Sequence, residues 1–335
     1  MAEKILLAHG EGGKRTRDLI RSVVLSRFGN PVLDPLLDSG LLGRIEGEVA
    51  FTTDAYIVTP PVFPGGDIGR LAVCGTLNDL AVCGANPVAI SCSLILEEGL
   101  PVGELENVLD SMVEAAREGA VMIACGDTKV VERGKGDQIF ITTSGVGTLL
   151  PGWRPSPRTV IPGDRVILTG TMGDHQVAVL IARNRLELSA EVLSDAAPLS
   201  PMLLEILARF GADVRFMRDP TRGGVGVSLI EMAESSGRRI ILEEALLPVS
   251  PAVRGVCEIL GFDPLYLANE GKAILLVSPS ASDAVVSALR GHSYGRGAAV
   301  VGEVADGPPG VLLRTAVGGL RAVDYPVGDQ LPRIC

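Results

Sequence analysis

The sequence predicts a globular protein with two domains, each containing both strands and helices. The chain has 335 residues, enough for two domains, and 47% of them are hydrophobic. Its apolar runs alternate between strand-like and helical spacing. Four prolines between Pro151 and Asp164 indicate a linker. We therefore predict an N-terminal segment at 1–40, a first domain at 41–150, a linker at 151–164, a second domain at 165–322 and a C-terminal tail at 323–335.

The charge and the cysteine content exclude several classes of protein. The net charge is −10, whereas binding to nucleic acid needs a basic surface, so we predict no nucleic-acid partner. None of the six cysteines forms a C-x-x-C pair and the three histidines lack metal-ligand spacing, so we expect no zinc site. The apolar run after Met1 is too short for a signal peptide, and no run is long enough to span a bilayer. We predict a cytoplasmic protein with no membrane partner.

The N-terminal segment contains a glycine-rich loop and a helix. A short apolar run leads into Gly10–Gly13, and the apolar residues at 18–27 have helical spacing. Gly13-Lys14-Arg15-Thr16 resembles the end of a phosphate-binding P-loop. That motif needs a glycine five positions before Gly13, where this chain has Ala8, so we reject a P-loop.

The segment 49–58 is rich in β-branched and aromatic residues, which predicts a buried strand with Asp54 in its middle. A buried carboxylate is costly unless it meets a cation or a hydrogen-bond donor. This cost favours a metal or phosphate role for Asp54 over that of a polar residue in the turn at the end of the strand.

A helix is predicted over 68–82, with Asp67 at its N-cap and Asn78-Asp79 near its end. Asp67 and Asp79 are twelve residues apart, a rise of about 18 Å, so one ion cannot contact both carboxylates. Asp79 is therefore the better candidate for a metal ligand. A second buried strand at 88–96 and an amphipathic helix at 104–119 follow.

A strand at 121–124 is predicted to end just before Gly126-Asp127-Thr128, which places a carboxylate and a hydroxyl at the edge of a sheet. Lys129 follows, where it could contact phosphate oxygens or transfer a proton. The alternative is a solvated surface lysine, the usual state of this residue type. Another strand is predicted at 139–149.

The second domain is predicted to alternate between strands and helices. The strands are at 165–170, 240–242, 273–277 and 298–304, and the helices are at 175–184, 200–210, 227–235, 253–260 and 281–289. We interpret His175 as a structural residue and assign no chemistry to it. His292 lies in a glycine-rich turn, and everything beyond Val323 is predicted to be tail.

Two loops of the second domain carry polar residues beside glycines. In the loop 218–226, Gly223 and Gly224 allow a ligand to approach the backbone closely. Asp219 adds an anionic ligand there, and Arg222 adds a cation for phosphate. In the other loop, Asn269-Glu270-Gly271-Lys272 leads directly into a strand.

The chain ends on a cysteine, Cys335. Its α-carboxylate raises the pKa of its thiol by about half a unit, so the thiol of a free tail is a poor nucleophile. It needs activation inside a site or modification by a partner. Pro332 favours an extended tail, Leu331 and Ile334 offer apolar groups for docking, and Arg333 supplies a cation. Ten extended residues reach about 33 Å, enough to carry the thiol into a pocket on this protein or out to another.

Taken together, these motifs resemble one protein family. The resemblance is carried by Phe51-Thr52-Thr53-Asp54, Pro64-Gly65-Gly66-Asp67-Ile68-Gly69, Asn78-Asp79-Leu80-Ala81, Gly126-Asp127-Thr128-Lys129-Val130-Val131, Arg218-Asp219-Pro220-Thr221-Arg222-Gly223-Gly224, Asn269-Glu270-Gly271-Lys272 and Pro332-Arg333-Ile334-Cys335. This set is similar to the HypE family of hydrogenase maturation proteins, and it spans essentially the whole chain. Glu11 departs from the pattern, since a small polar residue is usual at that position.

The resemblance implies a fold. It is the α+β, two-domain PurM-like (AIR synthase-like) fold, whose N-terminal domain pairs with its copy in a dimeric β-barrel-like interface, followed by a flexible C-terminal tail. It also implies that ATP binds in a cleft together with Mg²⁺.

The resemblance further implies an activity, an ATP-dependent carbamoyl dehydratase. A HypF-type carbamoyltransferase modifies the Cys335 thiol, and the S-carbamoyl group is then dehydrated to a thiocyanate. The cyanide passes to iron on a HypC–HypD complex for [NiFe]-hydrogenase.

Site residues follow from the resemblance and from the motifs. The expected catalytic residues are Cys335, Lys129, Glu270 and His292, the last three being candidates for the base. The expected metal ligands are Asp54, Asp79, Asp127 and Asp219. The expected ATP contacts are Asp54, Asp67, Asn78, Asp79, Asp127, Thr128, Arg222, Gly223 and Gly224.

Two alternatives remain open. One is another ATP-dependent enzyme of the superfamily that acts on a free small molecule, such as a selenide kinase or a ring-closing amidine ligase. Selenide kinases carry a reactive residue near the N-terminus, whereas no cysteine precedes Cys74 here. The other is a non-catalytic scaffold with the terminal cysteine as a tether. A prenylation box is absent because the cysteine is the last residue.

Overall fold

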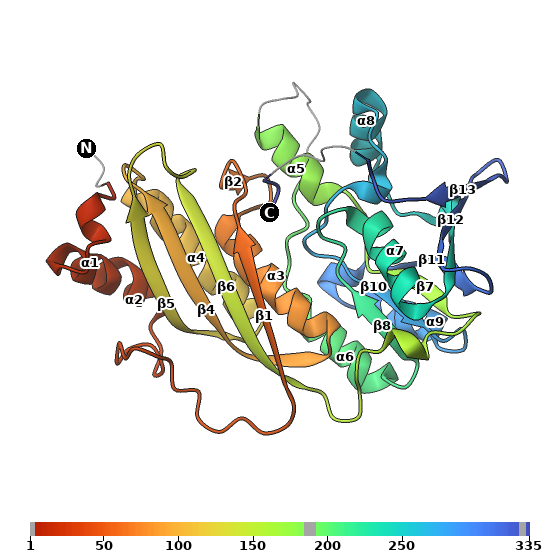
Figure 1. The fold of residues 1–335 in the computed structure, drawn as a ribbon, viewed down its shortest axis with the longest axis horizontal. Coiled ribbons are helices and arrows are strands. Elements are labelled where there is room, and N and C mark those ends of the chain that lie inside the picture. The colour runs from red at the N-terminus through yellow and green to blue at the C-terminus, as the bar shows by residue number, and fades with distance from the viewer. Residues whose placement is uncertain (1–3, 184–191, 328–332) are drawn as a thin grey trace.

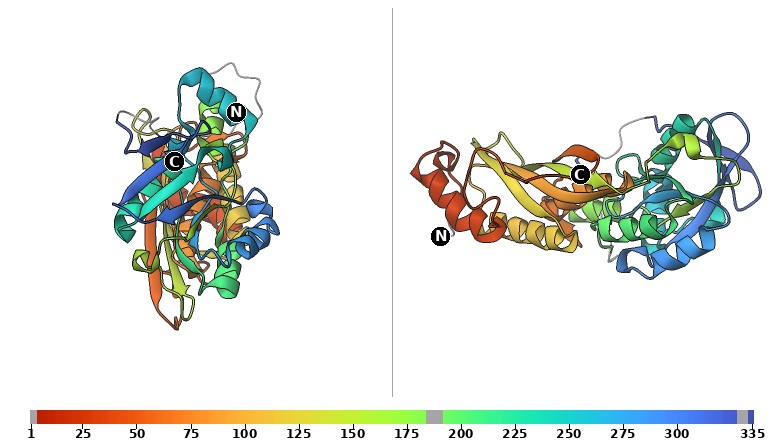
Figure 2. Two further views of the ribbon diagram at one scale, coloured as in Figure 1. Left: turned by 90° about the vertical axis from the view of Figure 1, so that its right-hand side faces the viewer. Right: turned by 90° about the horizontal axis from the view of Figure 1, so that it is seen from below.

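The computed structural model describes residues 4–183, 192–327 and 333–335. The molecule is elongated, with two α+β halves side by side and the N-terminal helices at one far end (Figures 1 and 2). The C-terminal residue lies between the halves, near β2 and α5 (Figure 1). The mixed α+β class expected from the sequence is confirmed.

The N-terminal half is built on a four-stranded sheet in the order β1-β6-β4-β5. The parallel pair is β4 with β5, and the other two pairs are antiparallel. The strands are β1 (Val49–Tyr56), β4 (Ala85–Glu97), β5 (Met122–Val131) and β6 (Ile139–Leu149). The sheet of the single chain is open, so the expected barrel would need a second copy.

Helices α3 (Ile68–Val82) and α4 (Val102–Glu118) pack on one face of this sheet (Figure 1). Before the sheet come a short 3-10 turn (Leu7–His9) and one continuous helical segment made of α1 (Lys14–Leu19), a π-helical turn (Ile20–Val24) and α2 (Leu25–Phe28). A small hairpin of β2 (Val62–Phe63) and β3 (Gly66–Asp67) leads into α3. Almost every residue of α3 is buried, because the helix lies between the sheet and the C-terminal half.

The C-terminal half has a seven-stranded sheet in the order β13-β12-β9-β11-β7-β10-β8. Its strands are β7 (Arg165–Leu168), β8 (Val214–Arg218), β9 (Arg239–Glu243), β10 (Ile274–Val277), β11 (Ala299–Ala305), β12 (Gly310–Arg314) and β13 (Leu320–Val323). Its helices are α5 (Asp174–Ala182), α6 (Ser200–Phe210), α7 (Gly224–Ser236), α8 (Pro251–Leu260) and α9 (Ser282–Arg290). Short 3-10 turns lie at Pro157–Thr159, Glu244–Leu246, Pro264–Tyr266 and Ser293–Gly295.

The strand β10 explains how this half is layered. Ile274 and Leu276 belong to the core cluster that contains α7, whereas Leu275 and Val277 belong to the cluster that contains α6 and α9. Successive side chains of a strand point to opposite faces, so a fully apolar strand requires cover on both faces. The sheet is therefore sandwiched between helices.

Two expectations about strands were wrong, and one pair of strands was missed. The strand at 121–124 does not end before Gly126 but continues to Val131, because parallel pairing with β4 supplies hydrogen-bond partners and overrides the low strand propensity of Gly and Asp. β1 is not a buried strand: it lies at an edge of the sheet, and alternate residues from Val49 to Ala55 are exposed. The hairpin of β12 and β13 was not foreseen at all.

Other expectations hold or fall outside the described residues. The helix expected at 175–184 is α5, and Asn184 lies outside the described residues, as do Leu331 and Pro332 of the tail. Among the described helices, none combines the length and the apolar composition needed to cross a membrane. The domain boundaries given above stay predictions.

Candidate active site

A cleft of about 720 Å³ lies between the two halves and contains the end of the chain. The N-terminal half contributes Asp54 from β1 and Asp79 from the last turn of α3. The C-terminal half contributes Asp219, which directly follows β8, and Glu270. Cys335 lies among them. Residues from distant parts of the chain therefore converge on the C-terminal thiol.

Two hydrogen bonds position the carboxylates of the N-terminal half. Thr52, Asp54 and Tyr56 are alternate residues of β1, so they point to the same side of the strand. The Asp79 carboxylate accepts a hydrogen bond of 2.6 Å from the Thr52 hydroxyl. The Asp54 carboxylate accepts one of 3.2 Å from the Tyr56 hydroxyl. The edge strand thus holds both acids at the cleft.

The glycines after Asp219 are required by the close approach of two backbones. Gly223 and Gly224 have positive φ values of 80° and 64° at the start of α7. A Cβ on Gly224 would lie 2.5 Å from the carbonyl oxygen of Leu267. A side chain at this position would therefore push α7 and the preceding loop, with Asp219 and Arg222, away from the rest of the half.

Three carboxyl groups in the cleft, those of Asp79, Asp219 and Glu270, have raised pKa values. Burial raises the pKa of Asp219 to about 7, and the nearby charge of Asp79 adds to this effect. Burial is also the largest cause of the raised pKa of Asp79, with a contribution from Asp54. For Glu270, burial and then the charge of Asp195 hold the pKa well above its usual range. Such crowding of acids favours a bound cation.

Glu270 and Cys335 form the centre of the cleft. One carboxyl oxygen of Glu270, Oε1, is buried and has no hydrogen-bond partner among the described residues. Burial, followed by the charge of Glu270, raises the pKa of the Cys335 thiol to about 12, and the two side chains lie within hydrogen-bonding reach. In this position the thiol is neutral and a poor nucleophile. The orphaned oxygen of Glu270 is free to accept a proton from a group attached to the sulfur.

The described end of the tail, residues 333–335, is docked rather than free. The backbone N–H of Ile57 donates to an oxygen of the Cys335 α-carboxylate at 3.2 Å, and that of Thr59 donates to the carbonyl oxygen of Arg333 at 3.3 Å. Ile334 lies between them and is buried in the core of the N-terminal half. The tail is therefore held by backbone hydrogen bonds and one apolar anchor.

Charged side chains flank this docked segment. Arg183 donates to the carbonyl oxygens of Thr59 and Arg333, while Arg333 forms an ion pair with Asp137. His175 of α5 hydrogen-bonds the carbonyl oxygen of Ile334 at 2.7 Å. The tail is thus held by both halves of the molecule.

Three predicted site residues lie away from this cleft. Asp127, Thr128 and Lys129 are on β5, at the opposite edge of the sheet from β1. Three strand spacings separate the two edges, about 14 Å. Asp127 and Lys129 form an exposed ion pair of 2.7 Å and line a second, mostly apolar cavity of about 210 Å³ beside the N-terminal helices. The single chain does not bring them to Cys335.

Two further predicted residues have other contacts. Asp67 caps α3 and accepts from the backbone N–H of Arg70 at 2.9 Å, as the sequence suggested. Asn78 is buried, and its amide bonds the backbones of Ala197, Leu199 and Glu270, which leaves no polar atom free for a ligand. These two side chains are therefore better explained as structural contacts than as ATP ligands.

His292 corrects an expectation about the base. Its ring lies 3.1 Å from the carboxylate of Glu205 on α6, and it does not line the cleft. The turn after α9 directs it to that helix instead. We therefore drop His292 as a candidate for the proton acceptor at Cys335.

The cleft is also not a ready-made metal site. Within residues 4–183, 192–327 and 333–335, no group of three His, Cys, Asp or Glu side chains converges at metal-binding distance. Magnesium, however, usually takes only one or two protein carboxylates and completes its shell with phosphate oxygens and water. The donor set of Asp54, Asp79 and Asp219 therefore fits magnesium bound together with a phosphate chain.

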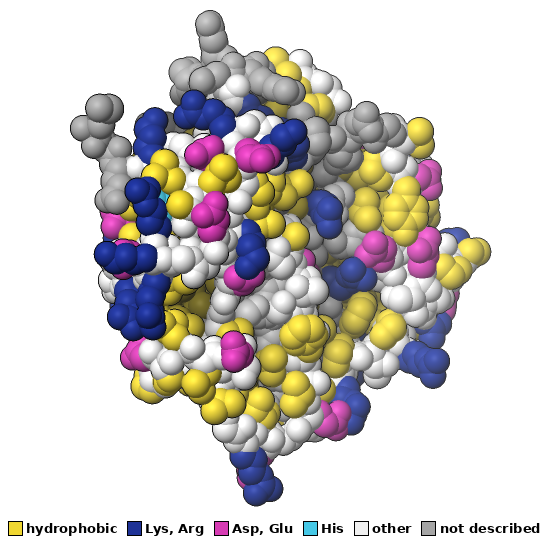
Figure 3. Space-filling model, turned by 60° about the vertical axis from the view of Figure 1, so that its left-hand side comes forward, with side chains coloured by type: hydrophobic (Ala, Val, Ile, Leu, Met, Phe, Trp, Pro, Cys, Tyr) yellow, Lys and Arg dark blue, Asp and Glu magenta, His cyan; other side chains and the backbone are white. Residues whose placement is uncertain are grey.

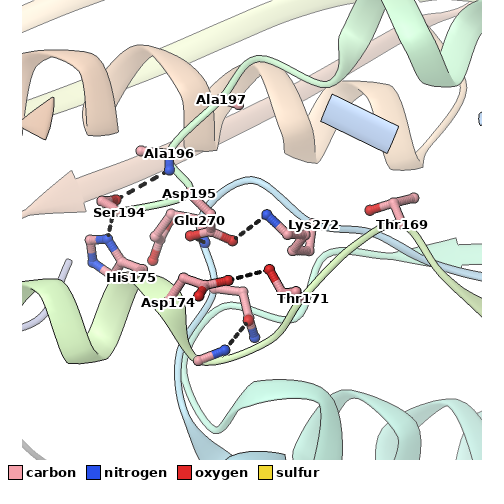
Figure 4. Close-up of polar contacts among 12 residues, drawn as sticks. Thr169, Thr171, Asp174, His175, Ser194, Asp195, Ala196, Ala197, Glu270 and Lys272 are labelled. Atoms are coloured by element: carbon pink, nitrogen blue, oxygen red, sulfur yellow. Dashed lines mark hydrogen bonds and ion pairs between the residues drawn. The ribbon is translucent and has the colours of Figure 1, made fainter. Parts of the chain in front are cut away.

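Sequence reasoning missed a polar network beside Glu270 (Figure 4). The Asp195 carboxylate accepts from the backbone N–H of Glu270 at 3.0 Å and forms a buried ion pair of 3.0 Å with Lys272. His175 and Ser194 hydrogen-bond each other in the same network. Asp195 stands in a loop without a recognisable motif, so no sequence signal could have found it. His175 was dismissed because nothing in the sequence links it to the tail.

Comparison with known proteins now adds to this geometry. The model of the AIR synthase related protein N-terminal domain matches residues 38–149, and that of the C-terminal domain matches residues 162–313. A carbamoyl dehydratase HypE from Cupriavidus necator is 46% identical over 334 residues, which are 99% of this chain and 95% of that protein. The chain belongs to the HypE family. Its curated members are named as enzymes, the carbamoyl dehydratases.

Solved structures agree with this assignment. The protein in a crystal structure of hydrogenase maturation protein HypE in complex with ATP is 42% identical in sequence to this chain. The two structures have a TM-score of 0.94, over 98% of this chain and 99% of that one. A structure of a HypE–HypF complex is 42% identical with a TM-score of 0.81, over 92% of this chain and 99% of that one. The expected PurM-like architecture is therefore confirmed.

The raised pKa of Asp219 predicts a pH-dependent effect of Asp219→Asn in buffer without divalent cations. The pKa of the Asp219 carboxyl is about 7 in the folded state and about 4 in the unfolded state. Its contribution to the stability of wild type is therefore fully present below about pH 4 and is lost as pH rises through about 7. The neutral amide avoids this loss. We expect the variant to be more stable than wild type by about 1–3 kcal/mol at pH 8. The advantage should disappear at pH 4, and urea unfolding at both pH values measures it.

A stability difference that is equal at pH 8 and pH 4 would contradict this explanation. Asp306→Asn, at an exposed loop position, is the matched control and should change neither value.

Proposed function

We propose that this protein dehydrates an S-carbamoyl group on its own Cys335 to a thiocyanate, with ATP as the driving reactant. The thiocyanate then supplies cyanide ligands for the iron centre of [NiFe]-hydrogenase. One observation carries the proposal: the C-terminal thiol is docked in a cleft of acidic residues, against the buried and unpartnered oxygen of Glu270.

The chemistry needs a leaving group and a proton acceptor. The amide oxygen of S–C(=O)–NH₂ leaves poorly, and ATP supplies the phosphoryl group that lets it depart as phosphate. Both protons leave the nitrogen, and the C–O bond is replaced by the third C–N bond, so the net change is the loss of one water. Glu270 takes a proton from that nitrogen. The same burial that raises its pKa makes its carboxylate a stronger base.

The cleft has a phosphate-binding side. Asp54, Asp79 and Asp219 provide oxygen ligands for Mg²⁺ bridged to phosphate, and the cation offsets the burial and the repulsion that raise the pKa values of Asp79 and Asp219. Arg222 faces the cleft and contacts phosphate oxygens, while Gly223 lets them approach the backbone. ATP is also the ligand in the solved HypE complex.

A homodimer completes the site. Exposed hydrophobic side chains lie on β1, β4 and β5, where no described helix covers the sheet, and they include Val49, Phe51, Ile95 and Met122. Figure 3 shows hydrophobic side chains over a large part of the face seen with the N-terminal half turned forward. Pairing two copies through these sheets buries them. It also brings the second cavity of one copy, which contains Asp127, Thr128 and Lys129, next to the cleft of the other copy.

Two partners act before and after the dehydration. A HypF-type carbamoyltransferase modifies the thiol, which agrees with the solved HypE–HypF complex. A HypC–HypD complex accepts the cyanide. Because Cys335 is partly buried when docked and its backbone is hydrogen-bonded to the body of the protein, the tail leaves the cleft to meet either partner.

The position of Cys335 argues against the two alternatives. A kinase or ligase for a free small molecule needs no terminal thiol in its cleft, yet Cys335 lines this one together with Glu270. A tethering cysteine needs full exposure, whereas this thiol is partly buried beside a carboxyl group whose pKa is raised.

The decisive experiment follows the mass of the C-terminal peptide. The protein is incubated with the carbamoyl-transfer partner, carbamoyl phosphate and Mg-ATP. We expect a carbamoyl adduct on Cys335 that then loses one water as ATP is hydrolysed. ATP turnover with an unmodified Cys335 would instead indicate a free substrate.

Cys335→Ala is the matched control. It should abolish cyanation while leaving the melting temperature and ATP binding unchanged, because the thiol makes no contact that the fold requires. Loss of ATP binding in this variant would contradict a substrate role for the tail.

Asp79→Asn should lower the rate of ATP hydrolysis about tenfold or more, because it removes a negative ligand from the bound cation. Its melting temperature should not fall, since the asparagine keeps the hydrogen bond from Thr52 and removes a crowded charge. Steady-state phosphate release measures the rate. Hydrolysis equal to that of Asp306→Asn would remove Asp79 from the metal site.

Phe51→Asp should convert the proposed dimer to monomers, because it places a charge in the centre of an apolar interface. Sedimentation equilibrium measures the mass in solution. Val317→Asp changes a hydrophobic residue that is even more exposed, in the turn between β12 and β13 and outside the sheet, and should leave the dimer intact. A wild-type protein that sediments as a monomer would refute the dimer itself.

A further inference from the structure

The docked tail is held across the boundary between the two halves. Backbone oxygens of Arg333 and Cys335 accept hydrogen bonds from Thr59 and Ile57 of the N-terminal half. The backbone oxygen between them, on Ile334, has a different partner. It meets His175 of the C-terminal half, 159 positions away in the sequence. The three described residues of the tail thus connect to both halves through their backbone oxygens.

The contacts of His175 fix its tautomer. The carbonyl oxygen of Ile334 can only accept, so the Nε2 atom, 2.7 Å away, carries the proton. The Nδ1 atom then accepts from the Ser194 hydroxyl at 2.8 Å. The Ser194 oxygen in turn accepts from the backbone N–H of Ala196 at 3.2 Å (Figure 4). The ring therefore presents a donor to the tail in a single orientation.

Packing restrains the ring as well. His175 is fully buried, and the edge of its ring meets Phe63 at a centroid distance of 5.3 Å and an angle of 88°. Burial lowers the pKa of the imidazole, which keeps it neutral. The ring of His175 is therefore preorganised for one partner, the Ile334 carbonyl, because both of its nitrogens are hydrogen-bonded and packing fixes its orientation.

None of these contacts involves the sulfur of Cys335. The docked segment is recognised by three backbone oxygens, by the buried side chain of Ile334 and by the ion pair of Arg333 with Asp137. A free thiol, an S-carbamoyl group and a thiocyanate leave all of these groups unchanged. The same docking contacts therefore serve every chemical state of the terminal residue.

We propose that His175 is a positioning residue, which holds the tail in the cleft through the Ile334 carbonyl in every modification state of Cys335. This deepens the proposed function, and it rests on that function only in taking the docked state as the one that is dehydrated. His175 touches neither the sulfur nor ATP. It acts by setting the fraction of molecules whose tail is docked.

Alkylation of the unmodified full-length protein measures this fraction without ATP or a partner. Iodoacetamide reacts with Cys335 when the tail is out of the cleft, and the mass of the C-terminal peptide reports the rate. His175→Leu removes the donor while keeping an apolar side chain of similar size. Loss of one buried hydrogen bond should speed the reaction of Cys335 about five- to tenfold. His175→Gln, which retains a donor, should restore protection at least in part.

Cys83 gives an internal control, because it is exposed at the end of α3 and belongs to the body of the protein. Its alkylation rate should be the same in wild type and in both His175 variants. Equal acceleration of Cys83 and Cys335 would indicate general loosening and would overturn the proposal, as would an unchanged rate at Cys335 in His175→Leu.

Ile334→Asp tests the same equilibrium, between the docked and the undocked tail, by changing the tail itself. This substitution leaves no cavity in either half when the tail is undocked. It should accelerate alkylation of Cys335 at least as much as His175→Leu, with Cys83 unaffected. Protection that survives in Ile334→Asp would refute docking through this residue.

Single-turnover dehydration of carbamoylated protein then separates positioning from a structural role. His175→Leu should slow dehydration by the same factor by which it lowers the docked fraction, and carbamoylation by the partner should not slow. Slowing of both steps would overturn the positioning role. If wild type forms no thiocyanate, the proposed function fails, whereas the alkylation result still decides what holds the tail.

Discussion

The side chain of Asn78 joins the two halves of the molecule through three buried hydrogen bonds. Its amide group donates to the carbonyl oxygens of Ala197 and Glu270, and its oxygen accepts from the backbone N–H of Leu199. The next residue, Asp79, faces the cleft. The last turn of α3 thus positions the Asp79 carboxylate and also holds the backbone of Glu270 in place. An unpaired buried amide would be costly, so the halves cannot separate here without losing stability.

This junction makes the crowding of acids possible. Asp54 and Asp79 come from one half and Asp219 and Glu270 from the other, and desolvation together with mutual repulsion raises the pKa of three of them. Such an arrangement is unfavourable for the free protein. Under the proposed function it becomes favourable when cations and phosphate arrive, and Glu270 is the carboxyl group that accepts a proton. The crowded acids at the cleft lower the stability of the free protein, and we propose that they are kept because the dehydration needs them.

Docking of the tail lowers the reactivity of the Cys335 thiol. An exposed thiol is open to oxidation and disulfide exchange. Here burial raises the pKa of the Cys335 thiol to about 12, so the docked form is unreactive. The contacts that protect the thiol are the backbone contacts that would present a modified sulfur to Glu270. The same docked position of the tail therefore protects the free thiol and would present the modified sulfur to Glu270.

Much of the candidate site could be predicted from the sequence. Asp54, Asp79, Asp219, Glu270 and Cys335 stand in short motifs whose residue types indicate cation, phosphate and thiol chemistry, and the structure gathers them in one cleft. The helices were also predictable, since their apolar spacing is local. Strand limits were less so: β5 continues through Gly126 and Asp127 because its neighbour β4 supplies hydrogen bonds that no local signal records.

The sequence by itself determined the chemical inventory, the two-domain α+β class and the family, because these depend on residue type and on local spacing. Only the tertiary structure decided which residues meet. It placed Asp127 and Lys129 at the edge of the sheet opposite to Asp54, and it paired His292 with Glu205. It also brought His175 to the carbonyl of Ile334. The physical reason is that a contact between residues 159 positions apart depends on how two domains pack, and no spacing along the chain encodes that packing.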